Sequence, residues 1–264
     1  MSATLTLPDT AATAAAGDGK YLYGIIEAPA PARFDVPAIG GRGDEVHTLQ
    51  LGRLAAVVSN SPRIDYDNSR RNMLAHTKVL EAVMARHTLL PVCFGTVGSD
   101  AETIIEKILR ARRDELVGLL GQMHGRMELG LKASWREETL FDEVLAENPA
   151  IRKLRDSLVG RSPDQSHYER IQLGELIGQA LQRKRQEDEE RVLERVRPFV
   201  HKTRLNKVIG DRMIVNAAFL VDEALEPGLD AAIRAMDEEW GDRLSFKYVG
   251  PVPPYNFVTI TIHW

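Results

Sequence analysis

The chain has 264 residues, of which 44% are hydrophobic and 27% charged, and its formal net charge is −4. This composition is typical of a globular protein that can bury a core, and the length favours two domains. The negative charge argues against a nucleic-acid partner, because phosphate binding needs an excess of positive charge. Cys93 is the only cysteine, which excludes an internal disulfide and a clustered-cysteine metal site and fits a reducing compartment.

Residues 1–19 are predicted to form a disordered N-terminal arm. They are rich in Ala and Thr, carry Asp9 and Asp18, and lack the basic start of a secretory signal. No uninterrupted apolar run in the chain approaches the roughly 20 residues that a membrane helix requires. We therefore expect a cytoplasmic protein that does not enter a membrane.

Residues 20–135 are predicted to form an N-terminal α+β domain. Residues 21–26 are a short, continuous apolar run, which is typical of a central strand covered on both faces. Residues 46–50 and 54–59 are rich in β-branched and apolar residues on either side of a glycine-containing turn. This pattern predicts a hairpin.

Two helices and two further strands are expected to complete this domain. Residues 69–87 have apolar side chains at helical spacing, and residues 89–95 follow as a strand. Ser99 and Glu102 have the spacing of a capping box at the start of the second helix. Residues 127–135 alternate between apolar and polar or small residues, which predicts a strand that closes the domain. The buried face of the first helix is predicted to comprise Met73, Leu80, Val83, Met84 and His87.

Residues 136–264 are predicted to contain a helical connection and a C-terminal domain. Asn148 and Pro149 are typical of a helix start, and a long helix is expected from about residue 166 to residue 197. Residues 182–191 contain no apolar side chain, so this part of the long helix is predicted to be an exposed strut. Its surface is expected to carry the four-apart charge pairs Arg183 with Glu187, Lys184 with Asp188, and Arg185 with Glu189.

The last sixty residues are predicted to form a strand, a helix and two more strands. The first strand covers residues 212–221, and the helix begins at Pro227. The final strands cover residues 244–249 and 255–262, and a stiff proline-rich turn separates them. This order is compatible with a reduced or modified ferredoxin-like α+β domain.

Few residues have the arrangement that catalysis or metal binding requires. His76 and His87 share a helix face, but no further ligand stands at helical spacing from either, so both are interpreted as histidines at the edge of the core. Cys93 is interpreted as a small core residue of an apolar strand. Asp65 and Asp67 precede a helix and are expected to cap it. We expect no catalytic set, no metal and no cofactor.

The proline-rich turn also carries a family resemblance. Residues 250–257 read Gly-Pro-Val-Pro-Pro-Tyr-Asn-Phe and resemble the Gly-Pro-x-Pro-Pro-Tyr-x-Phe signature near the C-terminus of the gas vesicle proteins GvpF and GvpL. Three earlier stretches are similar to segments of this family in the same order, so that the resemblance covers residues 20–264. Two residues depart from the family pattern. The pattern has Arg at the position of Cys93 and commonly has an aromatic residue at the position of Val252. The three stretches are residues 21–25, 76–96 and 127–135.

The resemblance implies an N-terminal α+β domain, a modified ferredoxin-like C-terminal domain and a non-enzymatic, chaperone-like role in building the gas vesicle shell. It implies the small shell protein GvpA as a partner, with other gas vesicle accessory proteins as further candidate partners. The protein could also be a minor component of the vesicle. A shell subunit exposes apolar surface to the gas, so a binding protein could cover that surface or offer a sheet edge. The candidate partner-binding residues are Pro251, Pro253, Pro254, Tyr255 and Phe257.

A second function class stays open on the sequence. A ferredoxin-like protein of the cytosol could instead bind a small molecule or act as an enzyme, with the ligand in a cleft between its domains. A deep polar pocket with convergent carboxylates or histidines would favour this alternative. The sequence therefore predicts two α+β bodies joined through helices, including one long helix, and leaves their ligand to be identified.

Overall fold

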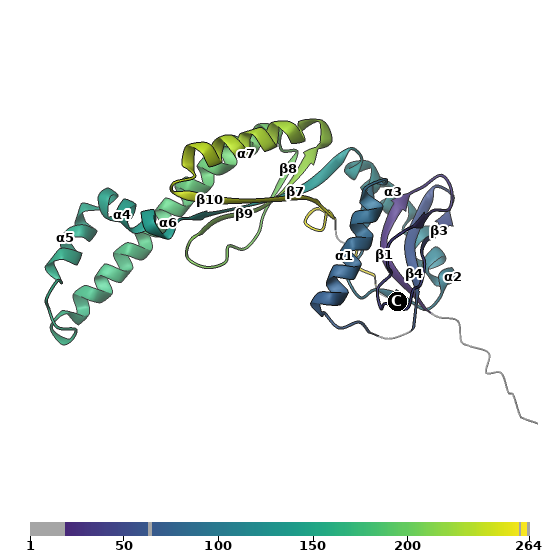
Figure 1. Ribbon diagram of the computed structural model, residues 1–264, viewed down its shortest axis with the longest axis horizontal. Coiled ribbons are helices and arrows are strands. Elements are labelled where there is room, and N and C mark those ends of the chain that lie inside the picture. The colour runs from purple at the N-terminus through teal and green to yellow at the C-terminus, as the bar shows by residue number, and fades with distance from the viewer. Residues whose placement is uncertain (1–18, 63–64, 259, 263–264) are drawn as a thin grey trace, which may run out of the picture. The chain divides into compact units, whose positions relative to one another are not determined.

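The computed structural model of the protein describes residues 19–62, 65–258 and 260–262. The chain divides into two compact units: unit 1 comprises Met1–Gln122 and Thr259–Trp264, and unit 2 comprises Met123–Val258. The predicted N-terminal arm lies outside the described residues, apart from Gly19, which begins the first strand. The fold is a mixture of helix and sheet (Figure 1).

In the described residues, unit 1 contains a six-stranded sheet with the order β2-β3-β4-β1-β5, and β6 pairs with β1. β1 is central and antiparallel to β4 and β5, as its continuous apolar sequence predicts. The predicted hairpin forms between β3 and β4, and Gly52 in its turn has a positive φ of 64°, which favours glycine. The strands are β1 (Gly19–Glu27), β2 (Arg33–Phe34), β3 (Val46–Leu51), β4 (Leu54–Ser61), β5 (Leu89–Pro91) and β6 (Val97–Gly98).

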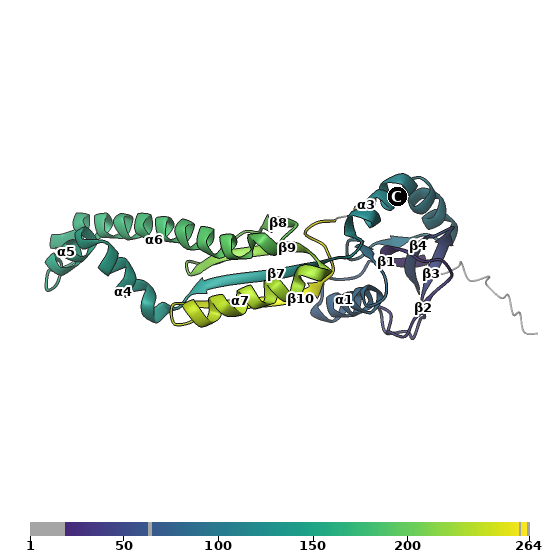
Figure 2. The ribbon, with the colours of Figure 1, turned by 90° about the horizontal axis from the view of Figure 1, so that it is seen from above.

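Helices cover both faces of this sheet. Figure 2 shows α1 (Arg70–Met84) on one face and α3 (Arg113–Met123) on the other. Ser69 caps α1 by accepting a hydrogen bond from the backbone N–H of Asn72. The stripe that packs on the sheet begins at His76, so Met73 in the first turn is 44% exposed and the prediction that it is buried is wrong. The buried residues of α1 are His76, Val79, Leu80 and Val83.

The second predicted helix of unit 1 is divided into three parts. α2 (Ala101–Ile104) continues into the π-helix η1 (Ile105–Arg110), and α3 follows. The capping box predicted for Ser99 and Glu102 does not form. Asp100 caps α2 instead, because its carboxylate accepts a hydrogen bond from the backbone N–H of Thr103 at 2.7 Å.

Unit 2 contains a four-stranded antiparallel sheet with the order β10-β7-β9-β8. The strand predicted to close the first domain is β7, which pairs with β9 and β10 and therefore belongs to unit 2. The domain boundary predicted after Trp135 thus falls earlier, between Gln122 and Met123. Alternation identifies a strand with one buried face, but it does not identify the strand's partners. The strands are β7 (Arg126–Trp135), β8 (Lys202–Leu205), β9 (Met213–Asp222) and β10 (Leu244–Val252).

Two helices, α6 (His167–Val196) and α7 (Glu226–Trp240), lie along one face of this sheet (Figures 1 and 2). α6 is the predicted long helix, and α4 (Glu137–Glu147) and α5 (Pro149–Ser157) precede it. Pro149 occupies the first turn of α5 as predicted, although the Asn148 side chain donates back to the carbonyl of Val144 rather than capping the helix. The core between the sheet and these helices includes Leu129, Leu131, Trp135, Val192, Val196, Phe219, Leu229 and Met236.

The middle of α6 is not the exposed strut that its composition predicts. Lys184 and Asp188 are buried, at 7% and 2% exposure. The two do not pair with each other as expected. Lys184 Nζ lies 2.8 Å from a carboxylate oxygen of Glu143 on α4, and Asp188 accepts hydrogen bonds from Trp135 and Arg243. An absence of apolar residues indicated exposure, but charged side chains can be buried when each finds a partner on another element.

The second of the two predicted terminal strands does not form in the described residues. The carbonyl of Pro254 accepts hydrogen bonds from the backbone N–H groups of Phe257 and Val258, at 3.1 and 2.9 Å. These bonds close a turn and use donors that a strand would offer to a neighbour. Beyond the turn, Ile260 makes a single parallel bridge to Val92.

Candidate partner-binding site

The turn that follows β10 brings the five candidate partner-binding residues together, but it exposes them unequally. Pro253 and Pro254 are buried, and Phe257 is half-buried. Pro251, which follows a cis peptide bond at the end of β10, is exposed, and Tyr255 is 37% exposed. Two of the five residues therefore face solvent, and the two buried prolines are part of the support beneath them.

A buried carboxylate holds this turn on the sheet. Glu128 of β7 is 3% exposed. One of its oxygens accepts a hydrogen bond from the backbone N–H of Asn256 at 3.0 Å, and the other accepts from the Asn256 side chain. Burial raises the pKa of Glu128, while the two bonds from Asn256 act in the opposite direction. Asn256 Oδ1 also accepts from Asn206 Nδ2 at 3.1 Å, so the turn is tied to two parts of unit 2.

Sequence reasoning missed Glu128. It stands at a polar position of an alternating strand, which is typical of a solvated side chain. Its partner is 128 residues away in the sequence, so no local pattern connects the two. The only sequence signal for this contact was Asn256 of the C-terminal octapeptide. Its role is explained by the structure, in which its side-chain amide and its backbone N–H both donate to the Glu128 carboxylate.

Three exposed apolar or aromatic residues lie close together in the chain at the end of an edge strand. Val249 of β10 is 42% exposed and precedes Pro251 and Tyr255 in the chain. β10 pairs with β7 on one side only, because it is the first strand in the sheet order. This surface, formed by Val249, Pro251 and Tyr255, is called the β10-end patch below.

A hollow of about 350 Å³ lies on the face of the unit 2 sheet opposite α6 and α7. Gly130 and Ala218, which are paired across β7 and β9, contribute small side chains to its lining. Lys132 and Lys247 stand directly opposite each other on β7 and β10. The remaining polar lining residues are Glu128, Asn206, Asn216 and Asn256.

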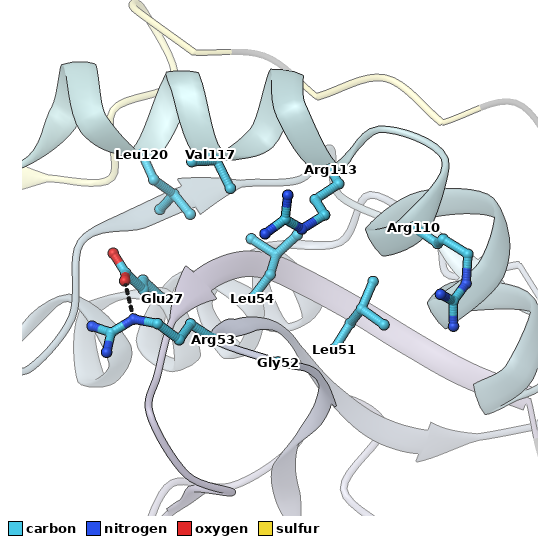
Figure 3. A pocket seen from close by; sticks show the side chains of 9 residues that line it. All are labelled: Glu27, Leu51, Gly52, Arg53, Leu54, Arg110, Arg113, Val117 and Leu120. Atoms are coloured by element: carbon cyan, nitrogen blue, oxygen red, sulfur yellow. Dashed lines mark hydrogen bonds and ion pairs between the residues drawn. The ribbon is translucent and has the colours of Figure 1, made fainter.

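Unit 1 carries a separate groove of about 430 Å³ beside the turn of the β3–β4 hairpin (Figure 3). Leu54 and Leu120 contribute apolar side chains to its lining. Figure 3 shows Arg53 paired with Glu27 at one side, where the Arg53 Nε lies 2.7 Å from a Glu27 oxygen. The other lining residues are Leu51, Gly52, Arg110, Arg113 and Val117.

The histidines, the cysteine and the two aspartates considered for chemistry are not among the residues that line the two hollows. His76 is buried, its Nδ1 lies 2.9 Å from the Tyr21 hydroxyl, and burial lowers its pKa to about 4, in agreement with the prediction of a core histidine. The His87 side chain is 3.3 Å from the carbonyl of Glu27. Cys93 is half-buried and follows β5, so it is not the interior strand residue that was predicted.

The acidic residues before α1 do not cap it. Ser69 is the cap, while Asp67 accepts a hydrogen bond from the side chain of Asn72. Within residues 19–62, 65–258 and 260–262, no group of three or more His, Cys, Asp or Glu side chains is placed to hold a metal ion. In the same residues, no helix has the length and apolar character of a membrane span.

Comparison with known proteins finds gas vesicle proteins along most of the chain. The family model described as "Gas vesicle synthesis protein GvpL/GvpF" matches residues 19–259. Gas vesicle protein F of Microcystis aeruginosa is 29% identical over 244 residues, which cover 92% of this chain and 98% of the relative. Gas vesicle protein F of a Streptomyces species is 31% identical over 242 residues, covering 90% and 98%. The crystal structure of GvpF from Anabaena sp. PCC7120 has a TM-score of 0.81 and 28% identity, and the match covers 93% of this chain and all of that one.

Proposed function

Because the chain belongs to the GvpL/GvpF family of gas vesicle synthesis proteins, we propose that it is a non-enzymatic assembly factor that binds the shell protein GvpA. A role in gas vesicles follows from the family. The proposal adds that the partner is GvpA and that the protein supports nucleation or growth of the shell. It also adds that the protein acts in the cytoplasm and is associated with the vesicle. The five candidate residues remain the proposed contact region.

The observation that carries this proposal is the β10-end patch. It combines an exposed aromatic side chain, Tyr255, with a turn that is anchored by Glu128 and Asn256. Aromatic residues on a supported surface are frequent anchors of protein interfaces, because they bury a large area at a small cost in side-chain entropy. Pro251 and Val249, at the end of β10, are the other exposed residues of the patch. Pro253 and Pro254 then contribute as buried support, and Phe257 as a partly covered neighbour.

The proposed partner has an apolar surface that the β10-end patch could cover. A shell subunit that presents apolar surface to the gas side exposes that surface before it polymerises, and large exposed apolar patches promote aggregation. A transient contact with a small, rigid apolar patch would cover part of this surface. The free edge of β10 beside the patch can also pair with an extended segment of the partner, since edge strands offer unpaired backbone groups.

The arrangement of unit 2 supports the proposed ferredoxin-like classification of this region. Its elements follow the order β7, helices, β8, β9, helix, β10, which is a β-α-β-β-α-β sequence. The first and last strands are neighbours in the sheet. The modification consists of the first helical connection, in which α4 and α5 precede the long helix α6.

The proposal is tested by replacing the exposed aromatic residue of the patch. Tyr255→Ala in the full chain is expected to weaken binding of purified, tagged GvpA by about tenfold, because an interface anchor that contributes about 1.4 kcal/mol corresponds to that factor. Tyr168→Ala is the matched control, since Tyr168 is an 83% exposed tyrosine on α6 outside the patch, and it is expected to change binding by less than about twofold.

Point variants suit this test better than a truncated chain. Removing the residues after Gly250 would also remove Asn256 and leave the buried Glu128 without its two hydrogen-bond donors. Equal binding of GvpA by the Tyr255→Ala and Tyr168→Ala variants would remove the β10-end patch as the contact. Absence of GvpA binding by the unmodified chain would contradict the assembly role.

A further inference from the structure

The open face of the unit 2 sheet places two lysines against each other. Lys132 of β7 and Lys247 of β10 are directly opposed in an antiparallel pair, and both are exposed. Opposed residues of such a pair lie on the same face, and like charges in these positions repel each other. Among the described residues, neither ammonium group forms an ion pair with a carboxylate. The chain therefore maintains a repulsive pair that its own side chains do not compensate.

Two more cations share this face. On β8, Arg204 is opposite Ala218 and Lys202 is opposite Leu220. Ala218 and Leu220 are in turn opposite Gly130 and Glu128 of β7, and Lys132 is opposite Asn216, so all these side chains lie on the side away from α6 and α7. We call the surface formed by Lys132, Lys247, Arg204 and Lys202 the basic face.

The carboxylates on this side of β7 and β9 do not neutralise the basic face. Asp222 of β9 lies 2.7 Å from the Nε of Arg126, which is opposite it on β7. Glu128 is buried, and both of its oxygens accept hydrogen bonds from Asn256. The positive charges are therefore available to a ligand. This differs from the unit 1 groove, where Arg53 is 2.7 Å from Glu27 and Arg110 is 2.7 Å from Glu106.

The hollow in the basic face leaves room for a side chain or backbone segment of a ligand to approach the sheet closely. Gly130 and Ala218 line the hollow with small groups. A Cβ atom at Gly130 would come within 3.0 Å of a Val249 methyl group, so a larger residue there would crowd this wall. Asn206 and Asn216 add polar groups at the rim.

From this charge complementarity we propose that the basic face binds a carboxylate-rich segment of a partner protein. The inference rests on the proposed function, in which the chain acts by binding a protein, and it adds a contact surface of defined chemistry that borders the β10-end patch at Val249. Sheet faces that bind single-stranded nucleic acid use aromatic side chains on which bases stack. The outward positions of β7 and β9 carry no aromatic residue, which favours an acidic peptide: they are Arg126, Glu128, Gly130, Lys132, Ser134, Met213, Asn216, Ala218, Leu220 and Asp222.

The test uses the full chain and a fluorescent decapeptide of alternating glutamate and alanine as the probe. The unmodified chain is expected to bind this peptide, to ignore the matching glutamine–alanine peptide, and to bind more weakly as salt is added, because exposed charges are screened. The Lys132→Ala, Lys247→Ala double variant is expected to lose at least about tenfold in affinity, since two charge-assisted contacts are removed.

A matched control separates the site from the overall charge. Lys107→Ala, Lys153→Ala removes two exposed lysines from η1 and α5 and changes the net charge by the same amount. It is expected to change the affinity by less than about twofold, because neither lysine belongs to the basic face and salt screens the general effect of exposed charges. Equal losses in both double variants, or no peptide binding by the unmodified chain, would overturn the inference.

Two further measurements keep the interpretation specific. The Lys132→Ala, Lys247→Ala variant is expected to unfold at an unchanged or higher urea concentration, because a repulsive pair is removed. A markedly lower midpoint would contradict the absence of compensating partners. Displacement of the acidic peptide by a single-stranded oligonucleotide at equal charge concentration would overturn the assignment to an acidic protein segment.

The outcome is independent of the test of the proposed function. Peptide binding by the Tyr255→Ala variant at the unmodified affinity is expected, because Tyr255 is not part of the basic face. Failure of GvpA binding together with intact peptide binding would contradict the proposed partner and leave the basic face supported. Failure of peptide binding with intact GvpA binding would contradict only the inference about the basic face.

Discussion

The two units bury polar groups of different kinds. In unit 1 the buried polar side chains between sheet and helix are neutral, as with Tyr23 and His76. In unit 2 they are charged, as with Lys184 and Asp188. In both clusters the buried polar groups have hydrogen-bond partners. Losing a partner would cost more free energy in unit 2, because an unpaired buried charge costs far more than an unpaired hydroxyl.

The neutral cluster of unit 1 is built from hydroxyl and ring groups. The Tyr21 hydroxyl accepts a hydrogen bond from the backbone N–H of Gly95 at 3.0 Å and lies 2.9 Å from His76 Nδ1. The Tyr23 hydroxyl accepts from the backbone N–H of Ile39 at 3.0 Å, and burial raises the pKa of Tyr23. Burial also lowers the pKa of His76 to about 4, so this cluster is uncharged near neutral pH.

The charged cluster of unit 2 joins four elements. Arg243, just before β10, donates to Asp188 of α6 at 2.9 Å and to Glu143 of α4 at 3.0 Å. Trp135 Nε1, at the end of β7, donates to the same aspartate at 2.8 Å. The hydrogen bonds with Arg243 hold the pKa of Glu143 below its usual range. The cluster therefore fixes where the middle of α6 lies on the sheet, a task that apolar side chains perform near its C-terminal end.

This contrast indicates that the charged cluster should be the more sensitive of the two. Arg243→Met leaves two carboxylates, those of Asp188 and Glu143, without their shared cation. We expect the free energy of unfolding to fall by about 3–5 kcal/mol, the cost of breaking a buried ion pair from one side. Urea unfolding followed by circular dichroism measures this change.

Arg183→Met on the same helix is the matched control, because Arg183 is exposed and its hydrogen bond to Asn148 Oδ1 is at 3.2 Å. It should cost less than about 1 kcal/mol. Adding Asp188→Leu to Arg243→Met should recover part of the loss, since the most buried carboxylate is then removed. A loss for Arg243→Met no larger than that of the control would show that the two clusters do not differ in this way.

The neutral cluster predicts a pH dependence of its own. His76 has a folded pKa of about 4, below the ordinary value of 6.5, so the unfolded chain binds the proton first as the pH falls. The contribution of His76 is fully present above pH 6.5 and is lost between pH 6.5 and about 4, at about 1.4 kcal/mol per pH unit.

Unfolding free energies of the unmodified chain and of His76→Gln, compared from pH 7 down to about 4.5, measure this contribution. The variant is expected to lose stability less steeply as the pH falls. His124→Gln, an exposed histidine, is the control and should follow the unmodified chain. Parallel curves for all three proteins would mean that His76 accepts a proton in the folded state.

Glu128 is intermediate between the two clusters, since it is a buried carboxyl group that is held by amides rather than by a cation. Glu128→Gln retains one oxygen acceptor and loses the other. We expect a loss of about 0.5–1.5 kcal/mol near neutral pH, the net contribution of one hydrogen bond. Glu138→Gln, the same change at an exposed position of α4, provides the comparison by urea unfolding.

The pH dependence of Glu128 has the opposite sign to that of His76. Its folded pKa is raised above 4.5 by burial, so its contribution to stability falls as the pH rises through the interval between 4.5 and the raised value. Glu128→Gln should remove this dependence. A loss above about 3 kcal/mol would instead place Glu128 with the charged cluster, because such losses are typical of broken buried ion pairs.

Much of unit 1 could be predicted from the sequence. The central strand, the β3–β4 hairpin and the buried face of α1 from Leu80 to Val83 follow from local apolar patterns and a glycine turn. In unit 2, the alternation of β7 and the apolar face of α7 were also predicted from the sequence. In the candidate site, the turn itself was predicted, while the burial of Pro253 and Pro254 was not.

The sequence by itself determined many of the elements, because periodicity and turn chemistry act over a few neighbouring residues. Only the tertiary structure decided that β7 joins β9 and β10, that Lys184 and Asp188 are buried, and that Glu128 holds the C-terminal turn. These contacts join residues 37 to 128 positions apart in the chain, such as Lys184 with Glu147 and Glu128 with Asn256. A charged residue is expected to be exposed when only the sequence is known. Its burial depends on a partner that only folding brings to it.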